Sequence, residues 1–127
     1  MSGKQEIRTD AAPVPRGSYS QAIAVGDLVF TAGMGPVDPA TGAVVGDDVA
    51  TQTDQVLRNL AAVLAEAGLT LADVVKSTVH LQHVQRDFAA YDQVYRQHFS
   101  APYPVRTTVG SDLLGILVEI DVVAARS

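Results

Sequence analysis

The spacing of apolar residues changes several times along this chain, and each spacing predicts a different element. Between residues 49 and 67, apolar side chains recur at intervals of three and four, which places them on one face of a helix. Asp47 and Asp48 come directly before this tract and suit the start of a helix, while Gly68 suits its end. We therefore expect a helix over residues 49–67.

From Val74 onward apolar and polar residues alternate, which is typical of a strand. One face is expected to carry Val75, Ser77, Val79 and Leu81, and the other Val74, Lys76, Thr78 and His80. Residues 70–73 resemble a capping box that opens a short turn before this strand. A second helix is expected over residues 88–99, with Asp87 as its cap. Its aromatic side carries Phe88, Tyr91, Tyr95, His98 and Phe99.

The remaining apolar runs are short and bounded by turn-forming residues, as strands are. They predict a hairpin of residues 22–25 and 28–32 around Gly26 and Asp27, two strands at 105–110 and 116–124, and a possible edge strand at 6–9. The order β-β-α-β-α-β-β predicts a single α+β domain over residues 1–127, with two helices on one face of a mixed sheet. The uncovered face of such a sheet needs a partner, and self-association is the economical answer.

Composition and charge exclude several classes of function. The chain is 47% hydrophobic and 18% charged, as in a globular protein, and it has no Cys, so no disulfide scaffold or Cys-ligated metal is expected. The lack of Cys fits a cytoplasmic protein. The net charge is −5 and the basic residues are dispersed, which argues against a nucleic-acid partner. No apolar run approaches the length of a membrane span, and residues 1–5 lack the apolar segment of a secretory signal.

Arg106 is the most informative residue of the chain. It follows Pro102 and Pro104 and stands at the start of an apolar, β-branched strand. A guanidinium held there suits a carboxylate ligand, because its planar fork donates two parallel hydrogen bonds and keeps its charge. An inter-strand or inter-subunit salt bridge also explains the residue on local grounds, so both alternatives stay open.

Glu119 and Tyr19 are two further candidates. Glu119 lies within the apolar tract 116–123, so its carboxylate either faces solvent or is paired and functional. Tyr19 lies in a loop rich in Gly and Ser, where its ring either covers the edge of the core or lines a ligand pocket. His80 and His83 point to opposite faces if both lie on a strand, and no third ligand is evident, so no metal site is expected. The chain has no Gly-x-Ser-x-Gly elbow, Walker loop or dinucleotide fingerprint.

Short motifs extend along nearly the whole chain. They are residues 12–22 (APVPRGSYSQA), 30–33 (FTAG), 38–39 with 41–42, 57–60 (LRNL), 67–69, 74–76, 87–88 with 94–95, 104–106 (PVR) and 118–120 (VEI). In this order and spacing they resemble the Rid family, also called YjgF proteins and labelled endoribonuclease L-PSP. The resemblance implies a chorismate-mutase-like fold and a homotrimer with ligand clefts between subunits. It also implies hydrolysis of reactive enamine and imine acids, such as 2-aminoacrylate in its 2-iminopropanoate form, to 2-oxo acids and ammonia, with no cofactor.

By position, the resemblance also assigns roles to single residues. It makes Arg106 the arginine that binds the substrate carboxylate and Glu119 the glutamate that holds or activates the attacking water. Tyr19 matches a tyrosine that lines the cleft, and Gly33 matches a glycine of the cleft floor. The chemistry is reasonable, because an imine carbon is already electrophilic and needs mainly a positioned water and a neutralised carboxylate.

Several substrate-binding positions depart from the deaminase pattern. Ala32, Gly33 and Met34 stand where the family has Ser-Gly-Gln, so a hydroxyl and an amide are lost. Asp92 replaces an asparagine and Thr108 replaces a cysteine. The turn before the last strand has Leu113-Leu114 where Leu-Pro is usual. An ionised Asp92 in the cleft is expected either to repel a second carboxylate or to pair with Arg106.

Three functions therefore stay open. The first is an imine deaminase that depends on Arg106 and Glu119. The second is a non-catalytic module that binds a small carboxylate such as a 2-oxo acid, which the changes at Ala32 and Asp92 favour. The third is a ribonuclease, against which the acidic balance and the lack of a paired His or Lys acid–base set both argue.

Overall fold

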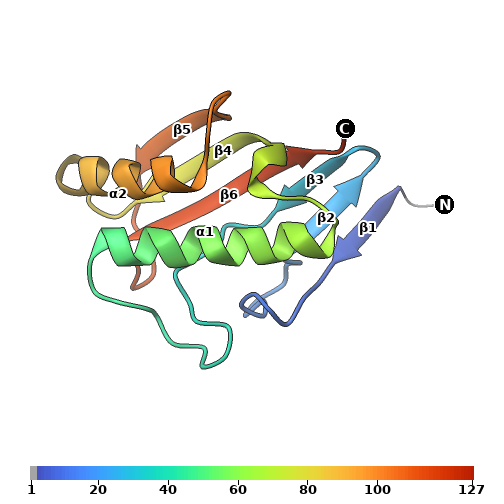
Figure 1. Cartoon of the computed structure of the whole chain (residues 1–127). Helices are drawn as coiled ribbons and strands as arrows, with labels where there is room; N and C mark the ends of the chain where they lie inside the picture. The colour runs from blue at the N-terminus through green and yellow to red at the C-terminus, as the bar shows by residue number, and fades with distance from the viewer. Residues whose placement is uncertain (1–2) are drawn as a thin grey trace.

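Six strands form one sheet in the order β1-β2-β3-β6-β4-β5 (Figure 1). The computed structural model describes residues 3–127. The strands are β1 (Lys4–Ile7), β2 (Ala22–Val25), β3 (Leu28–Thr31), β4 (Val74–Leu81), β5 (Val105–Gly110) and β6 (Val118–Ala125). β4 and β5 are parallel and all other neighbours are antiparallel, so the sheet is mixed, as predicted.

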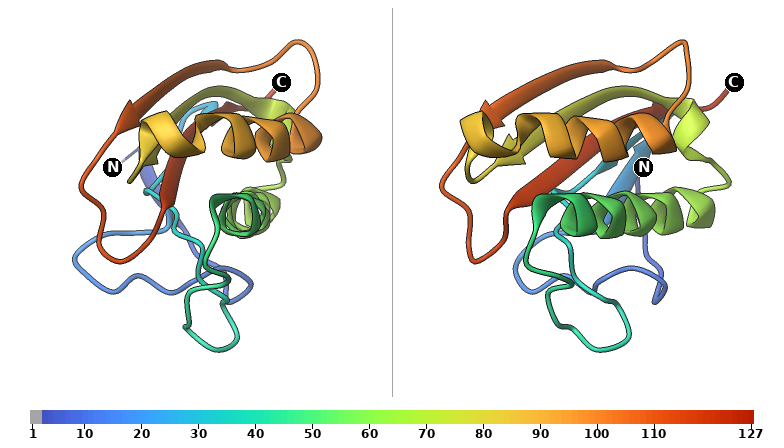
Figure 2. Two further views of the ribbon diagram at one scale, coloured as in Figure 1. Left: turned by 90° about the vertical axis from the view of Figure 1, so that its left-hand side faces the viewer. Right: turned by 60° about the vertical axis from the view of Figure 1, so that its left-hand side comes forward.

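Two helices, α1 (Val49–Glu66) and α2 (Val84–His98), cover the same face of this sheet (Figure 2). α1 packs against β6 and against α2, and α2 packs against β4. The core between the layers is apolar and includes Leu57, Leu60, Val79 and Ile120, all fully buried. The predicted α+β architecture is confirmed, with the possible edge strand present as β1.

The ends of α1 follow the predicted signals. The Asp48 carboxylate accepts a hydrogen bond from the backbone N–H of Thr51, 2.8 Å away, which satisfies one of the free amides of the first turn. Gly68, just beyond the helix, has a φ of +77°, a conformation that favours glycine. The predicted capping box is also present around a short 3-10 turn, η1 (Leu71–Asp73). The Asp73 carboxylate accepts a hydrogen bond from the backbone N–H of Thr70 at 2.8 Å, and the Thr70 hydroxyl accepts one from the backbone N–H of Ala72 at 3.2 Å.

Asp87 was wrongly predicted to cap the second helix. α2 begins one turn earlier, and His83 at its N-cap makes no side-chain capping bond. Asp87 is buried in the first turn, where its carboxylate accepts two hydrogen bonds from Arg86, at 2.8 and 3.0 Å. The polar residues before Phe88 concealed the true start of the helix, because they carry no apolar periodicity.

Two strands are displaced from their predicted limits. β1 ends two residues early, because the backbone of Thr9 bonds the Gln21 side chain and not a neighbouring strand. The Gln21 side chain accepts from the Thr9 N–H at 2.8 Å and donates to the Thr9 C=O at 3.0 Å. β6 begins at Val118 and not at residue 116. In β4 the predicted alternation holds from Ser77 onward, but Val74 is buried and Val75 is 47% exposed. A bulge between Val74 and Lys76 causes this reversal.

The face of the sheet that turns away from the helices is rich in exposed apolar side chains. They include Val25, Leu28, Phe30, Val105 and Val109. Val105, on the edge strand, is 67% exposed. Val25, Leu28 and Phe30 lie together on the paired strands β2 and β3, whereas Val105 and Val109 lie on β5, beyond β6 and β4. Apolar side chains exposed in this way are typical of an interaction surface. Within residues 3–127, no helix is both long and apolar enough to cross a membrane.

Candidate functional site

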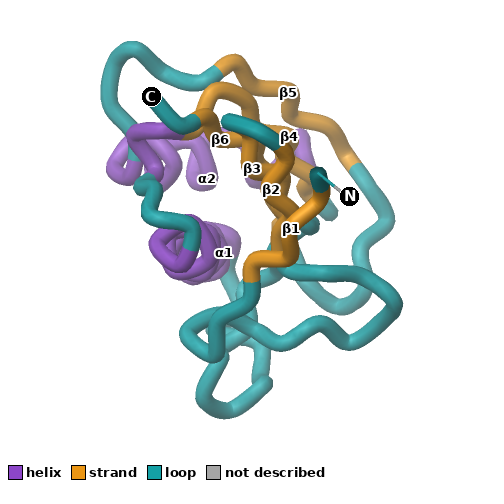
Figure 3. Tube along the Cα trace, turned by 90° about the vertical axis from the view of Figure 1, so that its right-hand side faces the viewer, coloured by secondary structure: helices purple, strands orange, loops and turns teal. Residues whose placement is uncertain are grey.

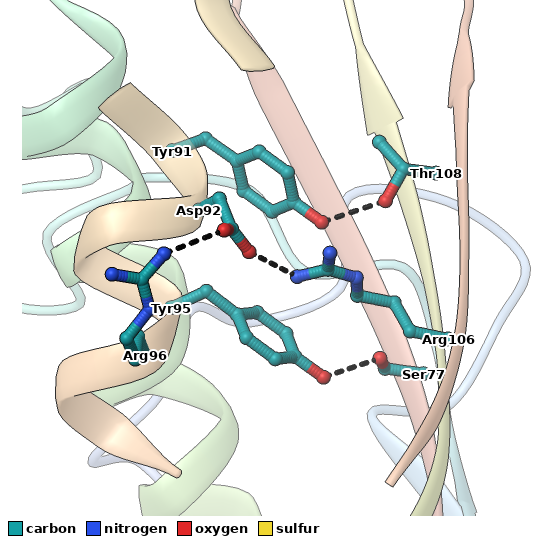
Figure 4. Close-up of polar contacts among 7 residues, drawn as sticks. All are labelled: Ser77, Tyr91, Asp92, Tyr95, Arg96, Arg106 and Thr108. Carbon is teal, nitrogen blue, oxygen red and sulfur yellow. Dashed lines mark hydrogen bonds and ion pairs between the residues drawn. The ribbon is translucent and has the colours of Figure 1, made fainter. Parts of the chain in front are cut away.

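Arg106 lies on the edge strand β5 and points toward helix α2 (Figure 4). Its backbone is opposite Ser77 of β4, whose side chain is fully buried on the helix-covered face. Because successive residues of a strand face opposite sides, Val105 and Thr107 point away from the helices and Arg106 and Thr108 toward them. The position at the sheet edge leaves the Arg106 side chain 23% exposed.

Three aromatic rings of α2 surround the guanidinium. Its central carbon lies 5.7 Å from the ring centre of Phe88, 5.3 Å from that of Tyr91 and 4.7 Å from that of Tyr95. Both tyrosine rings are held in place by shared hydrogen bonds of 2.7 Å, from the Tyr91 hydroxyl to Thr108 and from the Tyr95 hydroxyl to Ser77 (Figure 4). Burial raises the pKa of both tyrosine hydroxyls, so they remain neutral donors and acceptors.

Asp92 binds Arg106 directly. Arg106 donates from Nη1 to Asp92 Oδ1 at 2.7 Å, and Arg96 donates from Nη2 to Asp92 Oδ2 at 3.0 Å (Figure 4). Burial acts to raise the pKa of Asp92, but the hydrogen bonds and charges of Arg106 and Arg96 together outweigh it, and the pKa is lowered. The expected pairing of Asp92 with Arg106 is therefore confirmed, and the ion-pair alternative for Arg106 is realised with a helix and not with another strand.

Arg106 also lines a cleft of about 420 Å³, which we call the arginine cleft. Its lining residues are Asp92, Tyr95, Arg96, Tyr103, Pro104 and Arg106. Within residues 3–127, Nε and Nη2 of Arg106 have no hydrogen-bond partner, so these donors remain available. The ion pair with Asp92 thus uses only part of the guanidinium.

A second cleft of about 250 Å³, the glutamate cleft, lies among the loops at one end of the sheet. It is lined by Pro13, Val14, Arg16, Tyr19, Gln21, Ala32, Gly33, Met34, Gly35, Val37, Val44, Leu114, Ile116 and Glu119. Apart from Glu119, which lies on β6, these residues come from the loops after β1 and β3 and before β6, the long teal tracts of Figure 3. The structure therefore brings together four predicted site residues from distant parts of the sequence.

The loop after β3, which lines this cleft, is held in place by hydrogen bonds to α1 and β6. The fully buried Asn59 of α1 donates to the backbone oxygens of Gly35 and Val37, at 3.1 and 2.9 Å. Met34 exchanges backbone hydrogen bonds with Ile120 of β6. The Glu119 carboxylate lies over Gly33 so closely that a Cβ at this position would be 2.7 Å from Oε2. Glycine is needed here because any side chain would displace the carboxylate.

One chain does not bring Arg106 and Glu119 together. Glu119 is opposite His80 in the β4–β6 pairing, on the face away from the helices, whereas Arg106 is on the helix-covered face. Asp92 lies with Arg106, and Tyr19, Ala32 and Gly33 lie with Glu119. Thr108, which is bonded to Tyr91, lines neither cleft. Arg106 with Asp92, and Glu119 with its neighbours, thus form two separate groups of predicted site residues.

Several lining residues were missed by the sequence analysis. Arg96 was detectable, because its spacing of four from Asp92 on a helix is that of an ion pair. Tyr95 was placed on the aromatic side of the helix but not linked to Arg106. Arg16 donates to the carbonyl oxygen of Gly42 at 2.5 Å, a contact between distant loops that no local pattern indicates.

The two histidines that were considered as metal ligands, His80 and His83, lie outside both clefts. His80 shares a hydrogen bond of 2.7 Å with Ser111, and His83 lies at the start of α2. In the part of the chain that the structure describes, no group of three His, Cys, Asp or Glu side chains is placed to hold a metal ion.

Comparison with known proteins agrees with this arrangement. The strand order and the two helices on one face define the class, a small α+β protein with the YjgF-type, chorismate-mutase-like fold. A family model described as endoribonuclease L-PSP matches residues 9–126, and the chain belongs to this family, which includes the YjgF, RutC and Rid proteins.

Individual relatives cover almost the whole chain. It is 44% identical to a RutC family protein of Pyrococcus abyssi, over 95% of this chain and 96% of that protein. It is 37% identical to the chloroplastic Reactive Intermediate Deaminase A of Arabidopsis thaliana, over 95% of this chain and 65% of that protein. The crystal structure of E. coli TdcF with bound serine superposes with a TM-score of 0.90 at 36% identity, covering 97% of this chain and 99% of that one.

Proposed function

We propose that this protein hydrolyses reactive enamine and imine acids to 2-oxo acids and ammonia, in clefts that neighbouring subunits of a homotrimer complete. The observation that carries the proposal is Arg106, a partly buried guanidinium that is held by aromatic rings, lines an open cleft and keeps unused hydrogen-bond donors. Such a guanidinium suits a carboxylate, which accepts two parallel hydrogen bonds from it. The family includes a protein named for reactive intermediate deamination and one crystallised with serine, an amino acid with such a carboxylate.

Glu119 supplies the second part of the proposed chemistry. Its carboxylate has no hydrogen-bond partner within residues 3–127, lies over Gly33 and lines the glutamate cleft. A carboxylate in this position accepts a hydrogen bond from a water molecule and directs it at an imine carbon. Tethering the substrate through Arg106 supplies the orientation that makes such an attack effectively unimolecular.

A homotrimer would allow Arg106 and Glu119 to act on the same substrate although they lie far apart in one chain. Because Arg106 and Glu119 lie on opposite faces of the sheet, a cleft that uses both needs two copies. The exposed apolar face of the sheet gives the copies a surface to bury. In a closed ring each subunit places one surface against a different surface of its neighbour, so every interface can join an arginine cleft to a glutamate cleft.

Subunit complementation tests the proposal. Arg106→Ala and Glu119→Gln are each expected to lose at least about a hundredfold in ammonia release from imines generated by an amino-acid oxidase. When the two inactive variants are denatured and refolded together, random assembly gives about one-quarter of the clefts an intact Arg106 and an intact neighbouring Glu119. The mixture should therefore regain about a quarter of the wild-type rate.

Arg58→Ala is the matched control, because Arg58 is 69% exposed and pairs with Asp54 on α1, away from both clefts. It should keep the wild-type rate. An unchanged rate in Arg106→Ala would reject the assignment of this residue. A refolded mixture that stays inactive, although each variant assembles normally, would reject the shared cleft.

The second candidate function, a non-catalytic carboxylate-binding module, is favoured by the partial use of Arg106 by Asp92. In that case calorimetry would detect binding of a 2-oxo acid that is lost in Arg106→Ala, while the wild-type protein would release no ammonia from any imine tested.

A further inference from the structure

We infer that Asp92 makes the arginine cleft selective for zwitterions, so that the substrate form it accepts is the protonated iminium acid and not the 2-oxo acid anion. This inference rests on the proposed function and names the substrate form for the same site. It starts from the chain Arg96–Asp92–Arg106, in which each oxygen of one carboxylate accepts from a different guanidinium (Figure 4).

The aromatic rings restrict how a ligand reaches Arg106. Phe88, Tyr91 and Tyr95 all lie within 5.7 Å of the guanidinium carbon and help to fix its orientation. A ligand carboxylate that reaches Arg106 through the arginine cleft therefore enters the same cleft that Asp92 lines. The ligand thereby brings a second negative charge close to Asp92, and the repulsion between the two carboxylates opposes binding.

A positive charge on the carbon next to the ligand carboxylate reverses this effect. Each oxygen of Asp92 accepts one hydrogen bond in the structure and has a lone pair left for another donor. An ammonium or iminium group beside the bound carboxylate can donate to it, so the zwitterion lies head to tail along the Arg106–Asp92 pair. The cleft thus matches the charges of the ligand as well as its carboxylate.

The proposed reaction removes the positive charge that Asp92 favours, so substrate and product should differ in affinity. Water adds to the carbon of the protonated imine, R–C(=NH2+)–COO−, and the carbon–nitrogen bond breaks to give R–CO–COO− and NH4+. The substrate carries the positive charge that Asp92 favours, whereas the 2-oxo acid product does not. Asp92 therefore favours binding of the substrate over the product and assists product release.

Matched ligands test the inference. L-Alanine and pyruvate differ at the position where one carries an ammonium group and the other an oxo group. Calorimetry on wild-type protein should show alanine binding more tightly than pyruvate. In Asp92→Asn, which keeps the size of the side chain, pyruvate should bind about tenfold more tightly and alanine about tenfold more weakly, so that the preference reverses. Asp92→Ser, which removes the same charge, should show the same reversal if the asparagine variant does not fold.

Asp54→Asn is the control, because Asp54 also pairs with an arginine four residues along its helix but lines neither cleft. Its ligand affinities should equal those of the wild type. The inference is overturned if both ligands bind in an Arg106-dependent manner but Asp92→Asn changes their affinities by the same factor. If neither ligand binds the wild type, the carboxylate site of the proposed function fails and this inference fails with it.

Discussion

The arginine cleft and the glutamate cleft are built in opposite ways. Arg106 is enclosed by an ion pair to Asp92 and by three rings whose centres lie 4.7 to 5.7 Å from its guanidinium carbon. The Glu119 carboxylate has no ion pair or hydrogen bond within residues 3–127 and lies over the bare backbone of Gly33. One charged group is locked by its surroundings, and the other has its hydrogen-bonding capacity free.

The difference matches the two tasks in the proposed reaction. A group that only holds the substrate benefits from a fixed orientation, because less side-chain entropy is then lost when the ligand binds. A group that holds a reacting water needs free lone pairs at the moment of reaction. We therefore expect changes in the two clefts to affect different kinetic constants.

The largest expected effect is on turnover, in Glu119→Gln. The amide keeps the size of the side chain but cannot accept a proton from water, so kcat should fall about a hundredfold to a thousandfold. KM should stay within about threefold of the wild type, because Arg106 still holds the substrate. Steady-state kinetics of imine hydrolysis measure both constants. The exposed Glu66→Gln provides the control, and a large rise in KM at unchanged kcat would reverse the assignment of the two clefts.

The next effect is expected from a single methyl group at Gly33. In Gly33→Ala the new Cβ would come within 2.7 Å of Glu119 Oε2, so the carboxylate must move. We expect kcat to fall about tenfold to a hundredfold while the melting temperature changes little, because the far end of the Glu119 side chain can move. Gly33 has no positive φ, so the alanine itself causes no backbone strain.

Gly35→Ala is the matched control in the same loop. Its Cβ would meet Ile116 Cδ1 at 3.4 Å, an ordinary contact, and would leave Glu119 in place. Equal losses of kcat in the two variants would show that the loop as a whole, and not the approach of Glu119 to Gly33, controls turnover.

The sequence predicted the elements of the fold better than the arrangement of the candidate site, for physical reasons. The periodicity of residues 49–67 and the alternation from Ser77 onward were correct, because one buried face dictates each pattern. The bulge that exposes Val75 was not predictable, since it depends on pairing with β6. Arg106 and Glu119 were both placed on strands, but their separation onto opposite faces of the sheet depends on long-range strand pairing that no local pattern contains.

Removing a buried hydroxyl tests how firmly the arginine cleft is held. Tyr95→Phe leaves the Ser77 hydroxyl, buried beneath the ring, without the partner now 2.7 Å away. We expect the free energy of unfolding to fall by about 1–3 kcal/mol. Chemical denaturation of this variant, of Ser77→Ala and of the double variant gives the coupling between them. The double variant should lose less than the sum of the single losses, and simple additivity would show that the bond does not hold the ring.

The smallest expected effect is the dependence of stability on the charge of Asp92. Its pKa in the folded protein is lowered from the ordinary value of 3.8, because the hydrogen bonds and charges of Arg106 and Arg96 outweigh the opposing effect of burial. Its stabilising contribution is therefore fully present above pH 3.8 and is lost as the pH falls through the lower folded-state pKa. Since the pair is partly exposed, this contribution should be at most about 1 kcal/mol.

Asp92→Asn should accordingly be less stable than the wild type at pH 7, and the difference should shrink as the pH falls below the ordinary aspartate range. Thermal unfolding of both proteins from pH 7 to pH 3 measures this. In an Arg106→Ala background the same substitution should cost less at pH 7, because one of the two guanidinium partners is gone. A difference that grows in acid would have the wrong sign for a carboxylate stabilised as the anion. It would then be unsound to treat Asp92 as the fixed negative charge of the arginine cleft.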